Sequence, residues 1–112
     1  TNDLFDYEFV NPWMALNEKN YTIYKKTTTN LERETLLQRL LTVNMLHFFS
    51  AVPYREEARI LVKTHLHSLN IKFKNQNMMG FRGRFTTNVK LPDFIGFGKS
   101  VSRGYGTIQL IK

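Results

Sequence analysis

The sequence contains no cysteine, only three prolines and six glycines, and no long uninterrupted apolar run. The absence of cysteine excludes a disulfide framework and thiolate metal sites. The first thirty residues lack the cationic start and apolar run of a signal peptide, and the most apolar stretch, residues 40–52, is too short to cross a bilayer. We therefore expect a soluble, cytoplasmic protein that makes no membrane contact and needs no cofactor.

Acidic residues are scarce in the second half of the chain. Residues 1–59 carry seven Lys and Arg against eight Asp and Glu, whereas residues 60–112 carry nine against one. Surfaces that only need to be soluble usually mix both signs. A field of one sign predicts a polyanionic partner, most simply a nucleic acid.

The first half predicts a strand followed by two helices. Phe5, Tyr7 and Phe9 alternate with acidic residues, which indicates a strand over 4–10. Asn17 can cap a short helix over 18–26. Thr29 and Glu32 have capping-box spacing, so a long amphipathic helix should begin there and span 30–51, before Pro53.

From residue 59 onward the apolar residues alternate, as in strands with one apolar and one cationic face. Two such segments, 60–66 and 69–74, precede a turn at 75–77, and a third covers 79–89. A closing strand is expected at 107–111. The predicted fold is one α+β domain over residues 1–112, a ferredoxin-like (RRM-like) antiparallel sheet packed on one face by the long helix. Its second helix would be reduced to a short turn near 92–95.

Residues 96–106 form a glycine-rich segment in which a loop is expected. Four glycines allow close approach of the backbone to a ligand, while Lys99 and Arg103 supply charge and Ser100 and Ser102 supply hydroxyl donors. This chemistry suits a phosphodiester backbone, although a tight structural turn is the alternative. The glycine pattern disfavours nucleotide hydrolysis and dinucleotide binding, because the remaining glycines and the following helix of those motifs are absent.

Two histidines, His65 and His67, lie two apart on a predicted strand and so share a face with Lys63. They lack a third ligand at a recognisable spacing, so a metal site is disfavoured. General acid–base catalysis remains open, as does a simple polar role on a wet or RNA-facing sheet. His47 lies in the apolar half of the long helix and is expected to be a hydrogen-bonded core or boundary residue.

Most aromatic residues, Trp13 among them, are expected in the core. For Phe97 and Tyr105 in the glycine-rich segment, core packing and stacking on bases are both open.

The run LPDFIGFGKSVSRGYGT at 91–107 resembles the C-terminal glycine-rich motif of the endoribonucleases that process CRISPR repeat RNA. The segments MGFRGRF at 79–85 and PWMALN at 12–17 are similar to the C-terminal domain of one subtype of that family. The resemblance implies tandem ferredoxin-like domains that bind repeat RNA and cut it without metal, the ribose 2′-hydroxyl acting as nucleophile. It also implies that this chain is the C-terminal half and that the catalytic histidine belongs to the N-terminal half.

The first hypothesis is therefore binding of CRISPR repeat RNA as the C-terminal domain of that endoribonuclease. Its predicted RNA-binding residues are Gly96, Gly98, Lys99, Ser100, Ser102, Arg103, Gly104 and Gly106 in the loop and Lys63, Lys72, Lys74, Arg82, Arg84 and Lys90 on a cationic sheet face. One alternative is a non-catalytic scaffold that docks on another subunit of an RNA-guided complex, and another is a nuclease that uses His65 or His67. A homodimer also remains open.

Overall fold

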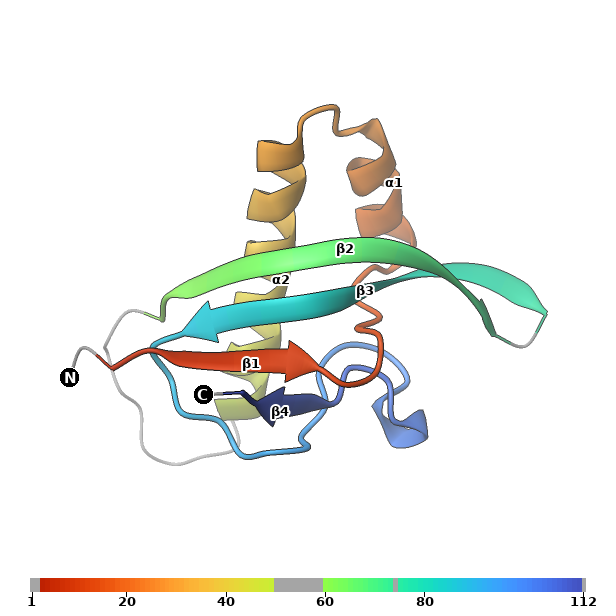
Figure 1. The fold of residues 1–112 in the computed structure, drawn as a ribbon. Coiled ribbons are helices and arrows are strands. Elements are labelled where there is room, and N and C mark those ends of the chain that lie inside the picture. The colour runs from red at the N-terminus through yellow and green to blue at the C-terminus, as the bar shows by residue number, and fades with distance from the viewer. Residues whose placement is uncertain (1–2, 50–59, 74, 112) are drawn as a thin grey trace.

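The computed structural model describes residues 3–49, 60–73 and 75–111. The elements are β1 (Phe5–Phe9), α1 (Glu18–Lys26), α2 (Asn30–Phe49), β2 (Val62–Phe73), β3 (Gln76–Thr87), the 3-10 turn η1 (Val101–Arg103) and β4 (Ile108–Leu110). The antiparallel sheet has the order β2-β3-β1-β4, and both helices lie behind it in Figure 1. This is the predicted α+β, ferredoxin-like arrangement.

Both helices begin where the capping residues predict. The side chain of Asn17 accepts a hydrogen bond from the backbone N–H of Asn20 at 2.8 Å, which satisfies one of the unpaired donors of α1. At the start of α2, the Glu32 N–H donates to the Thr29 hydroxyl at 3.2 Å. That hydroxyl donates in turn to the Glu32 carboxylate at 2.8 Å, so the Glu32 side chain reaches the hydroxyl of Thr29. The predicted last residues of this helix, 50 and 51, lie outside the described residues.

The two faces of the sheet differ in what covers them. Tyr7, Phe85 and Thr64 form one cross-strand row, and all three are buried on the side of the helices. Since successive side chains of a strand point to opposite faces, the neighbouring row of Glu8, Arg84 and His65 lies on the other side. These three side chains are exposed, and no helix among the described residues covers this face, which is called the open face below.

The strand β2 is one unbroken strand of 12 residues, and it pairs with β3 in a constant register from Val62 to Phe73. The sequence instead indicated two segments, because the apolar phase shifts between Leu66 and Leu69. The continuous register places Leu69 and Ile71 on the open face and turns Lys72 toward the helix side. The shift is tolerated because the β2–β3 hairpin extends past the core, as Figure 1 shows, so its far end has no apolar layer to match.

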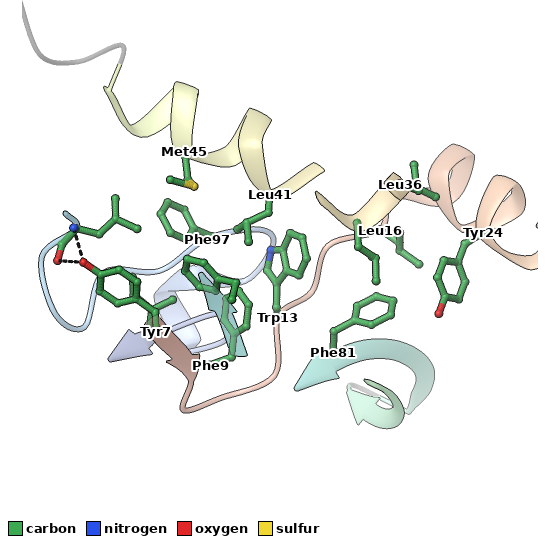
Figure 2. Close-up of a cluster of buried hydrophobic side chains, with 14 residues drawn as sticks. Tyr7, Phe9, Trp13, Leu16, Tyr24, Leu36, Leu41, Met45, Phe81 and Phe97 are labelled. Atoms are coloured by element: carbon green, nitrogen blue, oxygen red, sulfur yellow. Dashed lines mark hydrogen bonds between the residues drawn. The ribbon is translucent and has the colours of Figure 1, made fainter. Parts of the chain in front are cut away.

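The core lies between the sheet and α2, and Figure 2 shows its aromatic centre. Trp13 is fully buried, stacks on Phe9 with ring centroids 5.3 Å apart and donates its indole N–H to Asn44 of α2 at 3.1 Å. Its backbone also forms a bridge to Phe81 of β3. The expectation that Trp13 is a core residue is confirmed, and it ties the segment after β1 to both layers.

The second helix of the ferredoxin-like arrangement is replaced by an irregular segment between β3 and β4. It contains a turn at Asp93 and Phe94 and the three-residue η1. Backbone bonds from Phe94 to Ile108 and from Ile108 to Ile95 fasten it along the outer edge of β4. Among the described residues, no helix is long and apolar enough to cross a membrane.

Candidate nucleic-acid interface

The glycine-rich segment, residues 96–106, is a loop that is anchored by backbone hydrogen bonds. Phe97 N–H donates to Gly106 C=O at 3.1 Å, and Gly106 N–H donates to Pro12 C=O at 2.8 Å. Lys99 N–H donates to Met14 C=O at 3.0 Å. The loop is therefore docked against the segment that follows β1, and its anchors leave the middle of the loop facing outward.

Two glycines are required by this docking. Gly98 has φ +88°, and a Cβ there would lie 2.7 Å from the Met14 carbonyl oxygen and 2.9 Å from the Trp13 ring. Gly106 has φ +75°, and its Cβ would collide with the Phe97 carbonyl oxygen. Both positions combine a left-handed backbone with close approach of another chain segment, which is the situation that favours glycine.

The exposed part of the loop carries the charge that the sequence predicted. Gly98, Lys99, Ser102 and Arg103 are exposed, and Ser100 is half-buried with a left-handed φ of 60°. The other glycines shape the loop: Gly96 and Gly104 are half-buried and Gly106 is buried. Cations and hydroxyl groups on an anchored loop can bind phosphate at little entropic cost.

The two aromatic residues of the loop differ. Phe97 is 3% exposed and packs edge-on against Phe48 of α2, with ring centroids 6.4 Å apart. Phe97 is therefore a core residue and has no face available for stacking on a base. Tyr105 is half-buried.

The open face brings together some of the predicted cations but is not purely basic. Lys63, Arg82 and Arg84 are exposed there and share the face with His65 and His67. One row runs across all four strands from His65 through Arg84 and Glu8 to Gln109.

Two acidic residues of β1 also lie on the open face. Glu8 is beside Arg84, and Asp6 accepts a hydrogen bond from Thr86 at 2.6 Å. Strand pairing thus places the acidic first strand beside the basic third one. The acidic first half and the basic second half of the chain therefore meet on one sheet face, an arrangement that the charge pattern of the sequence did not predict.

The remaining predicted cations lie elsewhere. Lys72 is exposed but turned to the helix side of the hairpin, so the expectation that it shares a face with Lys63 is wrong. Lys90 is exposed in the segment after β3, beyond the paired rows of the sheet. Lys74 lies outside the described residues.

The open face and the loop meet at one corner of the molecule. The guanidinium of Arg82 donates to the Val10 carbonyl at 2.9 Å, and the next residue, Asn11, donates its side-chain amide to the Gly104 carbonyl at 3.0 Å. A chain of two hydrogen-bonded contacts therefore links a cation of the open face to the loop.

The described residues contain no group of three His, Cys, Asp or Glu side chains close enough to hold an ion. His65 and His67 are exposed on the open face. His47 is exposed near the end of α2 and is therefore not a core residue. It lines a shallow hollow of about 250 Å³ beneath the loop.

A larger hollow, of about 450 Å³, lies beside Lys99 and was not predicted from the sequence. It is bounded by the segment after β1, the start of α1 and the far end of the β2–β3 hairpin. The hairpin end and Lys99 are distant in sequence from residues 14–21, so no short-range sequence pattern indicates this hollow.

Comparison with known proteins identifies the family. The model of the Cas6b C-terminal domain family matches residues 1–111. An uncharacterized protein of Methanocaldococcus jannaschii is 33% identical over 107 residues, which are 95% of this chain and 72% of that protein.

Two solved structures are similar over 99% of this chain, each with 43% sequence identity. One is a crystal structure of Cas6b, with a TM-score of 0.91, and the other is a crystal structure of the CRISPR RNA processing endoribonuclease Cas6b, with a TM-score of 0.92. The chain spans 65% and 56% of the lengths of those two chains. With its ferredoxin-like sheet and anchored glycine-rich loop, the chain belongs to the Cas6b C-terminal domain family.

Proposed function

We propose that this chain binds CRISPR repeat RNA as the C-terminal domain of a metal-independent endoribonuclease that processes CRISPR precursor transcripts. The family match over residues 1–111 carries the proposal, and the similarity to an endoribonuclease of known structure supports it. The catalytic histidine would belong to the N-terminal domain of such a protein. This chain would supply affinity for the RNA and its orientation.

The RNA-binding surface consists of the loop at 96–106 and the neighbouring open face. Lys99 and Arg103 are exposed on a loop whose backbone is already fixed, so they can contact phosphates without first ordering the chain. Lys63 and Arg84 continue the positive charge on the open face. Glu8 interrupts it and would keep phosphates out of the middle of the sheet.

The experiment is a filter-binding titration of the chain with repeat RNA, in competition with random RNA of equal length. We expect a preference for repeat RNA, and we expect the double variant K99A/R103A to weaken binding at least tenfold. The matched control is K19A/K25A, which removes two exposed lysines from α1. Equal affinity for repeat and random RNA would favour the scaffold alternative, in which the basic residues dock on another subunit.

A second candidate function is cleavage by this chain itself, favoured by the exposed row of His65, Arg84 and Glu8 on the open face. One side chain of this row would take the proton from the ribose 2′-hydroxyl as that oxygen attacks the adjacent phosphorus. Another would donate a proton to the departing 5′-oxygen, which leaves a 2′,3′-cyclic phosphate. Incubation of repeat RNA with the chain in EDTA tests this. Cleavage that disappears in H65A/H67A would support it, and intact RNA would exclude it.

A further inference from the structure

The hollow of about 450 Å³ beside Lys99 has the size and the chemistry of a ligand site. Because the β2–β3 hairpin extends past the core, its helix-side face changes from aromatic at Phe81 to polar at Asn70 and Asn77. Together with the start of α1 and Lys99 of the glycine-rich loop, these residues line the hollow.

The walls of this pocket offer carboxamide groups. Asn70 and Asn77 stand on the two strands of the hairpin, and both are exposed. Within the part of the chain that the structure describes, neither side chain has a hydrogen-bond partner. Asn17 lines the wall nearest to α1, where its oxygen already caps the helix and its amino group remains as a donor. A carboxamide offers a donor beside an acceptor, which matches the N6 and N7 edge of adenine.

Other lining residues offer an apolar and aromatic surface. Met78 and Met79 are half-buried and can offer their thioethers, whereas Met14 is only 1% exposed. The Tyr21 ring, which is 43% exposed, forms part of the rim. Polarizable sulfur and aromatic rings are good partners for the flat face of a base. A purely polar hollow would hold water, whereas this combination can hold a base on its face and on its edge.

The charges of the pocket fit a nucleotide. Among the lining residues that the structure describes, only Lys99 and Glu18 are charged. The Lys99 backbone is fixed by its bond to Met14, and its exposed side chain lines the pocket, where its ammonium group can contact a phosphate. Glu18 can accept a hydrogen bond from the exocyclic amino group of a base and disfavours a second phosphate inside the pocket.

We propose that this pocket binds one unpaired adenine nucleotide of the RNA, with the base against the methionines and the carboxamides and the phosphate at Lys99. The proposal rests on the proposed RNA binding and adds a base-reading site to a surface that otherwise contacts phosphates. In this proposal the loop also positions Lys99 beside the pocket, where it contacts the phosphate of the bound nucleotide.

The four methionines of the chain make a direct test possible. Three of them line the pocket, and the fourth, Met45 of α2, is fully buried in the core away from the pocket lining and serves as an internal control. In a methyl-labelled sample of the chain, titration with adenosine 5′-monophosphate should shift the Met14, Met78 and Met79 signals to saturation, with a dissociation constant in the millimolar range. The Met45 signal should stay in place.

Competing ligands and variants sharpen the test. Cytidine and uridine monophosphates should bind several-fold more weakly, and inorganic phosphate should leave the three signals unmoved. The variant N70A/N77A should weaken binding of the adenine nucleotide about tenfold. The matched control N30A, at an exposed position on α2, should bind normally. Silent signals, equal shifts with phosphate alone or equal binding of all nucleotides would overturn the proposal.

Binding of repeat RNA, measured on the same samples, separates this proposal from the proposed function. Preference for repeat RNA with silent methionine signals would overturn the pocket alone. Shifted signals without preference for repeat RNA would overturn the proposed function alone.

Discussion

Replacement of Gly98 by alanine should destabilise the fold through two separate costs. The backbone there has φ +88°, and a left-handed conformation costs a residue with a side chain about 1–2 kcal/mol. The new Cβ would also lie 2.7 Å from the Met14 carbonyl oxygen and 2.9 Å from the Trp13 ring, and such overpacking costs about 1–3 kcal/mol. Together these costs predict a loss of about 2–5 kcal/mol in the free energy of unfolding.

The matched control is Gly104→Ala. Gly104 also has a left-handed φ, +92°, but its Cβ would meet only the Asn11 side chain, at 3.4 Å. Only the backbone cost of about 1–2 kcal/mol should apply there. Urea denaturation followed by circular dichroism measures the free energy of unfolding of both variants. In thermal denaturation, the melting temperature should fall by about 4 °C for each kcal/mol lost. Equal losses in the two variants would refute the argument that Gly98 is required for close packing.

Two further substitutions test the core. In Tyr7→Phe, the N–H and C=O of Leu91, which bond the phenol at 2.6 and 3.1 Å, lose their partner, so about 1–3 kcal/mol should be lost in urea denaturation. Burial raises the pKa of Tyr7 above 10.0. The contribution of its hydroxyl to the free energy of unfolding is therefore full below about pH 10 and is lost as the pH rises through the folded-state pKa. The difference in stability between the wild type and Tyr7→Phe should narrow above about pH 10. Thr64→Val removes a buried hydroxyl that has no hydrogen-bond partner among the described residues. The melting temperature should therefore rise by about 4 °C, and a lower melting temperature would contradict this.

Local signals predicted the helices and most strands well. Asn17 and the Thr29–Glu32 pair marked both helix starts, because capping depends on residues only three positions apart. The aromatic alternation of β1 and the glycine content of the loop are equally local, so both were read correctly.

Features that depend on distant contacts were missed. The change in the apolar alternation within β2 predicted two strands instead of one, because the sequence cannot show that the hairpin continues past the core. The charge pattern predicted a purely basic sheet face, but pairing places Glu8 beside Arg84. The pocket beside Lys99 needs three segments to meet, and no short-range pattern encodes that meeting.

The most direct test of the central claim is the salt dependence of repeat-RNA binding. If the loop and the open face contact one RNA together, the slope of log K against log salt should fall by about 0.7–0.9 for each phosphate contact removed. We expect this reduction in K99A and again in K63A, with both reductions present in the double variant. An unchanged slope in K99A, or a double variant no different from K63A alone, would contradict the account.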